Sequence, residues 1–184
     1  IQFVLDQLPD NARIVATTGK ISREVYEYRD DQKASHHQDF LTVGAMGHAS
    51  HIALGLAMNQ PDKAIFCFDG DGAALMHLGG FATAGVYGSE NFRHIIFNNV
   101  AHESVGGQPT MADRLSFTGI AHACGYQTVY RAESKSQLDE TLNAFLNEPG
   151  PSLLEIVVRK GSRSDLIRPK TTPVENKRIL MEAL

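Results

Sequence analysis

The sequence predicts an α/β fold, in which helices cover both faces of a doubly wound, mostly parallel β-sheet. Two observations carry this prediction. Short apolar runs of strand length alternate with helical stretches along the chain, as they do in βαβ units. The chain has 184 residues, of which 42% are hydrophobic, and this is enough for one domain with a substantial core. No repeat, low-complexity tract or internal linker interrupts the pattern.

The individual elements follow from local composition. Strands are expected at residues 13–17, 40–43 (a short strand or an extended loop), 64–68, 94–97, 127–130 and 153–158. Helices are expected at 22–28 with Ser22 as the cap, and at 48–59, 73–87, 112–124 and 135–146. A short helix and a turn at 8–11 precede the first strand, and a long loop occupies 98–111.

Residues 1–163 are predicted to form the main domain, followed by a polar tail over 164–184 with a short helix at 175–184. Such a tail could pack on a partner or be mobile. The chain begins with Ile1 rather than Met and enters predicted structure almost at once. This start suggests a fragment or the second half of a longer polypeptide.

Composition and charge argue against several classes of partner. The net charge of −4 gives no support to binding of nucleic acid or of an anionic membrane. No apolar run approaches the length of a membrane span, and no secretory signal is visible. Cys67 and Cys124 lie in apolar surroundings and suggest no disulfide. We therefore expect a cytoplasmic protein, in which local charge, a metal ion and helix termini hold any anionic ligand.

Two stretches, Cys67–Ala74 and Phe97–Ala101, carry the strongest functional signal. Asp71 follows one apolar strand and Asn99 follows the next, at a separation of about one helical crossover. Their side-chain oxygens should therefore meet at the carboxyl edge of the sheet, where open α/β folds place their ligands. Carboxylate and amide oxygens suit Mg²⁺ or Ca²⁺ rather than zinc.

The glycines on either side of Asp71 indicate that the site also binds an anion. Gly70 and Gly72 let the backbone approach a ligand closely, and the helix that starts near Ala73 offers free N–H groups. A Gly-Asp-Gly or Asn-Asn sequence alone is usually only a turn or a loop. Both together, each after an apolar run and at this spacing, predict a metal–diphosphate site.

Gly-Asp-Gly followed by Asn-Asn at this separation resembles the cofactor signature of thiamine diphosphate (ThDP) enzymes. The resemblance implies a ThDP-binding fold and a bound Mg²⁺ with Asp71, Asn99 and the backbone carbonyl of Ala101 as ligands. It also implies that the segment from Gly70 to Ala73, with Asn99, binds the cofactor. The chain does not depart from this signature.

Gly44-Ala45-Met46-Gly47 stands between a predicted strand and a helix, just before the Gly-Asp-Gly unit. By itself it reads as a flexible turn with a core methionine, but its position favours a cofactor role. The resemblance implies that the Gly44 carbonyl accepts a hydrogen bond from the 4′-amino group of the aminopyrimidine ring, and that the Met46 N–H reaches a ring nitrogen. It also implies that the Met46 side chain wedges between the two rings and imposes the bent cofactor, which makes Met46 a catalytic candidate.

Charged and polar residues near these segments are candidates for the substrate. Lys20 and Arg23 are either solvent charges in the first turns of a helix or ligands of an anionic substrate group, and we assign them to the substrate. The polar loop 101–110 is either an ordinary surface loop or a lid, and its attachment to the metal asparagine favours a lid. His102 in this loop is the second catalytic candidate.

Histidines 36, 37, 48 and 51 gather in sequence around the Gly44–Gly47 turn. No further ligands for a zinc site are evident. We interpret these histidines as polar site lining or surface residues, with a proton-transfer role open for one of them.

Four segments narrow the resemblance: TTGKISRE, HHQDFLTVGAMGHASHIALGLA, FDGDGAALMHLGG and FNNVAHESVGGQPT. They closely resemble the phosphonopyruvate decarboxylase family, and nearly as closely the corresponding half of sulfopyruvate decarboxylases. The resemblance implies ThDP- and Mg²⁺-dependent decarboxylation of 3-phosphonopyruvate, a small anionic 2-oxo acid, to phosphonoacetaldehyde and CO₂. Two alternatives stay open: a sulfopyruvate decarboxylase subunit, and a Mg–diphosphate or nucleotide binder without chemistry. The absence of a Gly-x-Gly-x-x-Gly fingerprint weighs against a dinucleotide.

The resemblance also implies a partner. ThDP activation in this family needs a glutamate from a separate pyrimidine-binding domain, on the same polypeptide or on another subunit. Glu24, Glu90 and Glu103 do not fall in a segment that matches that domain. We therefore expect the cofactor at an interface and an oligomeric enzyme, most simply a homo-oligomer, with no decarboxylation by this chain alone.

Overall fold

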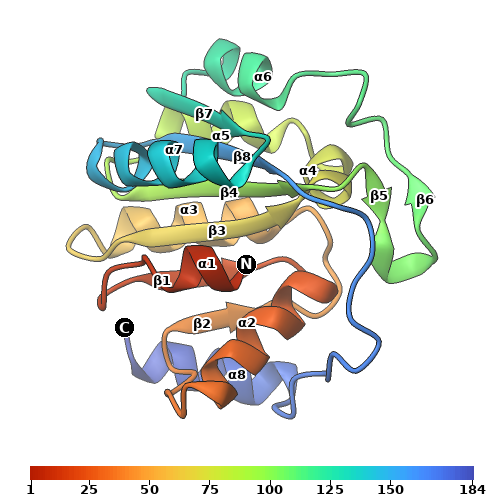
Figure 1. Ribbon diagram of the computed structural model, residues 1–184. Coiled ribbons are helices and arrows are strands. Elements are labelled where there is room, and N and C mark those ends of the chain that lie inside the picture. The colour runs from red at the N-terminus through yellow and green to blue at the C-terminus, as the bar shows by residue number, and fades with distance from the viewer.

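The computed structural model describes residues 1–184 and contains a six-stranded parallel sheet with the strand order β2-β1-β3-β4-β8-β7 (Figure 1). A separate antiparallel pair, β5 and β6, leaves the sheet after β4. The α/β class predicted from the sequence is confirmed. The strands are β1 (Arg13–Ala16), β2 (Asp39–Leu41), β3 (Ile65–Gly70), β4 (Phe92–Asn98), β5 (Ala101–His102), β6 (Gln108–Pro109), β7 (Thr128–Ala132) and β8 (Ser152–Val157).

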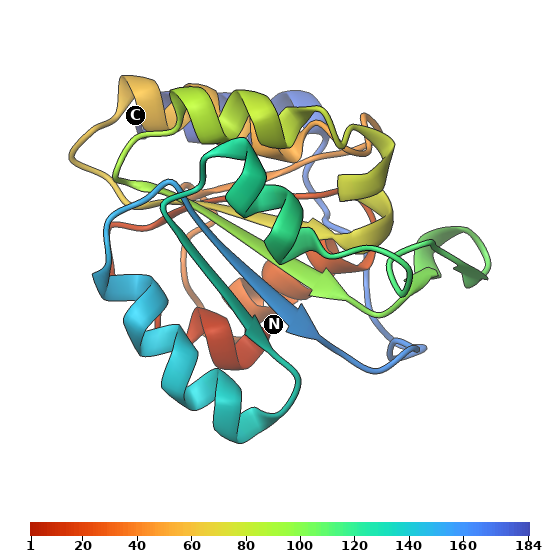
Figure 2. The ribbon, with the colours of Figure 1, turned by 90° about the horizontal axis from the view of Figure 1, so that it is seen from above.

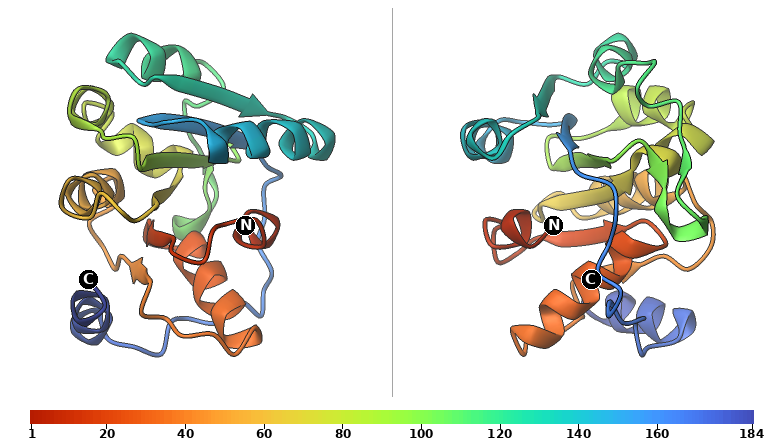
Figure 3. Two further views of the ribbon diagram at one scale, coloured as in Figure 1. Left: turned by 90° about the vertical axis from the view of Figure 1, so that its left-hand side faces the viewer. Right: turned by 45° about the vertical axis from the view of Figure 1, so that its right-hand side comes forward.

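Helices cover both faces of the sheet (Figure 3). One layer contains α3 (Ala49–Asn59), α5 (Gly80–Tyr87), α6 (Phe117–Cys124) and α8 (Pro173–Glu182). The other layer contains α1 (Gln2–Leu5), α2 (Lys20–Asp31) and α7 (Lys135–Asn147). The short helix α4 (Asp71–Met76) follows β3 directly, and a 3₁₀ turn, η1 (Glu103–Val105), connects β5 to β6.

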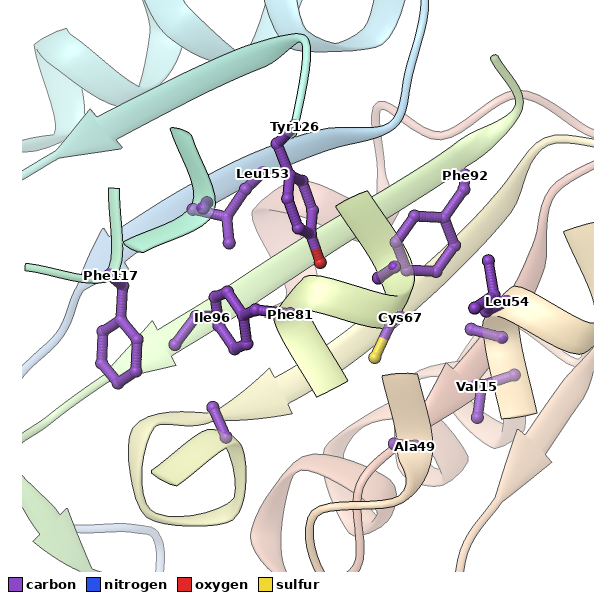
Figure 4. Close-up of a cluster of buried hydrophobic side chains, with 14 of the residues drawn as sticks. Val15, Ala49, Leu54, Cys67, Phe81, Phe92, Ile96, Phe117, Tyr126 and Leu153 are labelled. Atoms are coloured by element: carbon purple, nitrogen blue, oxygen red, sulfur yellow. The ribbon is translucent and has the colours of Figure 1, made fainter. Parts of the chain in front are cut away.

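The central strand β3 explains why the sheet has two cores, because successive side chains point to opposite faces. Ile65 and Cys67 belong to the cluster beneath α3, α5 and α6, whereas Phe66 and Phe68 belong to the cluster beneath α1, α2 and α7. Figure 4 shows the first cluster, whose aromatic rings come from α5, β4 and α6 and from Tyr126, which precedes β7. A parallel strand covered on both faces has no solvent side, so its sequence reads as one continuous apolar run.

The single helix predicted over 73–87 is wrong, because the structure has two helices there. α4 ends at Met76 and α5 begins at Gly80. Gly79 and Gly80 are poor helix formers, and a Cβ added to Gly80 would lie 2.4 Å from Cε1 of His51. The chain therefore bends around the His51 ring instead of continuing as one helix.

Two predicted helix starts are also wrong. α2 begins at Lys20 rather than at Ser22, whose hydroxyl donates to two carbonyl oxygens at the end of β1 (2.6 and 3.2 Å). Ser22 therefore ties α2 to β1 and does not cap the helix. α6 begins at Phe117 rather than at residue 112, because the Ser116 side chain accepts a hydrogen bond from the N–H three residues later (3.0 Å).

The C-terminal tail packs on its own chain. A capping box at the N-terminus of α8 fixes its start two residues before the predicted 175–184 helix. The helix lies against the edge strand β2 (Figure 1). Asn176, which is 4% exposed, accepts a hydrogen bond from Leu41 N–H (2.9 Å) and donates one to the Asp39 carbonyl (3.0 Å). These bonds satisfy backbone groups that an uncovered edge strand would leave unpaired.

The topology sets the place of the site. β1 lies between β2 and β3, so the chain leaves β1 toward one side of the sheet and later returns on the other. A ligand crevice is expected at the carboxyl ends of strands at such a switch point. The β5–β6 hairpin projects beyond the sheet at that edge (Figure 2). None of the helices combines the length and apolar character that a membrane span requires.

Candidate functional site

Asp71 stands at the end of β3 as the first residue of α4. It is 1% exposed, and its carboxylate accepts hydrogen bonds from neutral groups, the Thr110 hydroxyl (2.5 Å) and the Asn99 N–H (3.4 Å). Burial raises the pKa of the Asp71 carboxyl above its ordinary value, and these hydrogen bonds oppose the rise. A buried carboxylate whose hydrogen-bond partners are all neutral fits a site whose charge a metal ion completes.

β4 brings Asn99 beside Asp71, because β3 and β4 pair in parallel with Gly70 opposite Phe97. Ala101 follows two residues later, as the first residue of β5. The Asp71 and Asn99 side chains and the Ala101 carbonyl would offer only oxygen donors, the type that Mg²⁺ prefers. The residues that the sequence nominated as metal ligands are therefore neighbours, and their donor atoms fit the ion.

The turn that carries Asn99 is strained. Val100 has a φ of 56°, in the left-handed region that β-branched residues rarely adopt. The side-chain oxygens of Asn98 and Asn99 accept hydrogen bonds from the N–H groups of Val100 and Ala101 (3.1 and 3.0 Å) and hold the turn in this shape. Such strain concentrates at functional sites, where the surrounding structure enforces it.

Gly72 and His102 are in direct contact. A Cβ added to Gly72 would lie 2.4 Å from His102 Nδ1, so any larger residue at this position would displace the ring. Loop 101–110 therefore approaches the first turn of α4 closely only because residue 72 is glycine. This contact places His102 next to the Asp71 turn.

Met46 reaches the same place from the turn between β2 and α3. Gly44 and Gly47 in this turn have φ angles of 72° and 91°, which favour glycine. A Cβ on Gly47 would lie 2.6 Å from the His77 ring at the end of α4, and the Gly44 N–H donates to the Thr18 hydroxyl (3.2 Å). The turn is thus fixed both to α4 and to the exit of β1.

A cavity of about 220 Å³ opens between these segments. Arg23 and Gly44 are not among its lining residues, although both were candidates. Arg159, at the exit of β8, and Glu24, on α2, line it and were missed as site residues. Arg159 follows a strand end as Lys20 does, so the same rule could have found it. The sequence candidates that line the cavity are Lys20, Met46, Gly70, Asp71, Gly72, Ala73, Asn99, Ala101 and His102.

Loop 101–110 bridges two strand exits at the rim of this cavity. The Glu103 carboxylate accepts a hydrogen bond from the Gly161 N–H (2.8 Å), beyond the end of β8. Ser104 packs against Gly19, after β1, where an added Cβ would lie 3.1 Å from the Ser104 Cβ. The loop therefore occupies the position expected of a lid, and its role as one stays a prediction.

The histidines fall into two groups. The His48 ring centroid lies 4.0 Å from that of His77 and 6.2 Å from that of His51, beside the Gly44–Gly47 turn. Burial lowers the pKa of His51, and the neighbouring histidines lower it further. His36 instead stacks on Tyr26 with ring centroids 4.3 Å apart. None of these histidines lines the cavity.

The parallel sheet and the oxygen-rich site at its carboxyl edge define a domain of the ThDP-binding class. Residues 17–156 match the family model described as "Thiamine pyrophosphate enzyme, C-terminal TPP binding domain", thiamine pyrophosphate being a synonym of ThDP. The chain belongs to this family.

Comparison with curated proteins shows which ThDP enzymes the chain is similar to. Phosphonopyruvate decarboxylases of Streptomyces viridochromogenes and Streptomyces hygroscopicus are each 39% identical over 175 residues, which is 95% of this chain but only 43% and 42% of theirs. The chain therefore spans less than half the length of these relatives. Sulfopyruvate decarboxylase subunit beta of Methanocaldococcus jannaschii is 34% identical over 149 residues, covering 80% of this chain and 76% of that protein.

A solved structure shows the same fold. It is the X-ray structure of a protein from Mycobacterium smegmatis assigned to the thiamin diphosphate-dependent enzymes. It superposes with a TM-score of 0.67 over 87% of this chain and 31% of that chain, at 22% sequence identity.

Proposed function

We propose that this chain is the diphosphate-binding half of a ThDP- and Mg²⁺-dependent decarboxylase that converts 3-phosphonopyruvate to phosphonoacetaldehyde and CO₂. The buried Asp71 carboxylate, set beside Asn99 and Ala101 at the edge of the sheet, carries the proposal. Similarity to two phosphonopyruvate decarboxylases over 95% of the chain supports the choice of substrate.

The residues of this chain bind the metal ion and the cofactor and orient them. Asp71, Asn99 and the Ala101 carbonyl would hold Mg²⁺, and Gly70, Gly72 and Ala73 would line the diphosphate. Met46 would position the aminopyrimidine ring from within the cavity, and the Gly44 carbonyl would do so from the same turn at the cavity's outer side, since Gly44 does not line it. When bound, ThDP would supply the electron sink for the breaking carbon–carbon bond.

Proton transfer is assigned to the part of the cavity around His102. Its ring lies against Gly72, next to the metal turn, and lines the cavity. An imidazole changes its protonation state near neutral pH and can move a proton to or from a reacting group. We assign His102 this role in protonating the product.

Lys20 and Arg159 provide positive charge to the cavity in a chain whose net charge is −4. Arg23 lies on the same helix as Lys20 but does not line the cavity. A charge-assisted contact contributes about 1.5–3 kcal/mol, so Lys20→Met should raise KM or weaken ThDP binding by about tenfold or more. Arg23→Met is the matched control, because it removes the same charge three residues away.

The partner is a pyrimidine-binding domain that supplies the activating glutamate. A relative described as a subunit beta supports a partner on another chain, and relatives more than twice as long support one on the same chain. The cofactor would then lie at an interface, and the enzyme would be an oligomer. Glu24 is the competing acid within this chain, because it lines the cavity and burial raises its pKa.

Sulfopyruvate is the second candidate substrate, because the chain covers 76% of a sulfopyruvate decarboxylase subunit beta. Sulfonate and phosphonate groups differ mainly in charge and one proton.

The deciding experiment compares CO₂ release from phosphonopyruvate, sulfopyruvate and pyruvate by the complete enzyme. The highest kcat/KM on phosphonopyruvate is expected, and a preference for sulfopyruvate would reassign the substrate. Binding of ATP in preference to ThDP, with and without Mg²⁺, would instead indicate a binding module without chemistry. Turnover by the 184-residue chain alone, lost in Glu24→Gln, would refute the need for a partner.

A further inference from the structure

A second polar cluster lies in the core directly behind the metal turn. Its members are Asp69, His94 and Tyr126, which are 1%, 0% and 4% exposed. His94 Nδ1 lies 3.1 Å from the Tyr126 hydroxyl oxygen, and His94 Nε2 lies 3.6 Å from Asp69 Oδ2. Figure 4 shows the Tyr126 hydroxyl directed into the apolar cluster, toward Phe81 and Phe92. A linear chain of polar groups thus crosses an otherwise apolar core.

Asp69 connects this cluster to the site. Its Oδ1 accepts a hydrogen bond from the Gly70 N–H (3.0 Å), and the next residue is Asp71. Neither Asp69 Oδ2 nor His94 Nε2 has a hydrogen-bond partner in the chain, and the 3.6 Å between them is a polar contact longer than a hydrogen bond. Each is therefore the polar surrounding of the other, and removing the imidazole would leave a buried carboxylate oxygen facing apolar side chains.

Cys67 also lies near this pair, because ligand atoms of Cys67, Asp69 and His94 are within 4.8 Å of one another. These three residues would be a minimal metal site. The cluster is enclosed, however, and burial raises the pKa of the Cys67 thiol well above its ordinary value, so the thiol is protonated. The hydrogen bond between His94 and Tyr126 and the polar contact between His94 and Asp69 explain the same geometry without a fourth ligand or an entry path.

We infer that His94 is a positioning residue of the cofactor site: it fixes the Asp69 carboxylate, which holds the Gly70 peptide and so directs Asp71 toward the metal. The inference rests on the proposed function for the role of Asp71. Buried polar groups cost stability unless they are paired. In this inference the polar cluster is retained despite its cost in stability because it orders the Gly70–Asp71 turn, on which metal binding depends.

The test measures Mg²⁺-dependent ThDP affinity of the complete enzyme by calorimetry, together with the melting temperature without ligand. His94→Leu should weaken ThDP binding about tenfold, the lower end of the roughly 10–100-fold effect of groups that hydrogen-bond a metal ligand directly, because His94 acts on Asp71 through Asp69 and Gly70. His94→Gln should restore most of the affinity, because its amide nitrogen can take the place of Nε2. Phe92→Leu is the matched control, since Phe92 is equally buried on the same strand and its ring centroid lies 6.2 Å from that of His94. It should lower the melting temperature and leave the affinity unchanged.

Several outcomes would overturn the inference. They are an unchanged affinity in His94→Leu, an equal loss in Phe92→Leu, or no rescue by His94→Gln. If His94→Leu does not fold, Tyr126→Phe removes only the hydroxyl that faces Nδ1 and should weaken binding in the same direction. Stoichiometric metal in the purified enzyme that disappears in Cys67→Ala would replace the inference by a buried metal site. A wild-type enzyme that does not bind ThDP with Mg²⁺ would instead refute the proposed function.

Discussion

Replacing Asp71 by asparagine should separate cofactor binding from folding. The amide keeps the shape and can keep both hydrogen bonds, accepting from the Asn99 N–H and donating to the Thr110 hydroxyl. The variant therefore removes only a buried charge. Because burial raises the folded-state pKa of this carboxyl, its ionisation costs stability once the pH exceeds the ordinary Asp range. At pH 7, the ligand-free variant should be at least as stable as the wild type.

The effect on the cofactor should have the opposite sign. Asp71 is the one charged ligand in the proposed set, since Asn99 and Ala101 offer neutral oxygens. We expect its loss to weaken Mg²⁺-dependent ThDP binding at least about 100-fold, or about 2.7 kcal/mol. ThDP at about 100 times its Kd should stabilise the wild type by about 2.7 kcal/mol, or about 5–10 °C where this domain unfolds as a unit of about 150–250 residues. The variant at the same concentration should keep a shift of about 1 °C.

Thermal denaturation of the complete enzyme with and without ThDP and Mg²⁺ measures both effects in one experiment. Asp113→Asn is the control, because it removes the same charge from an exposed residue that lies three positions beyond Thr110. The reasoning fails if Asp71→Asn shows the full cofactor shift. It also fails if the ligand-free variant is several degrees less stable than the wild type, because the carboxylate would then be structural.

Three further predictions test other contacts. Gly72→Ala must displace the His102 ring, at a cost of about 1–3 kcal/mol, so decarboxylation by the complete enzyme should slow. Gly55→Ala is the control and should leave the rate unchanged, because no atom lies within 4 Å of a Cβ added to Gly55. Asn176→Ala leaves two buried backbone groups of β2 unpaired, so the free energy of unfolding in urea should fall by about 2–6 kcal/mol; an unchanged midpoint would mean that α8 does not hold the sheet edge. Because burial lowers the pKa of His51, the folded chain favours its neutral form, and stability should be lost as the pH falls below about 6.5. His51→Gln should flatten this part of the melting profile, and an identical profile would contradict the assignment.

The sequence by itself determined the α/β class and the identity of the segments at the site. Strands covered on both faces appear as apolar runs such as residues 64–68, and this signal is local. The Gly-Asp-Gly and Asn-Asn segments could be predicted to meet from the sequence alone, because each follows an apolar run and their separation accommodates one helical crossover between neighbouring parallel strands. Asp71 and Asn99 are accordingly adjacent in the structure.

Only the tertiary structure decided which side chains complete that site. The bond from Thr110 to Asp71 joins residues 39 positions apart, and the pairing of His94 with Asp69 depends on the register of β3 and β4. Lys20 and Glu24, about one turn apart on α2, line the cavity, whereas Arg23 on the same helix does not. The structure likewise decided the place of α8, which sequence periodicity locates but does not place on the edge of the sheet. These contacts form between elements that are distant along the chain, so composition and local spacing do not predict them.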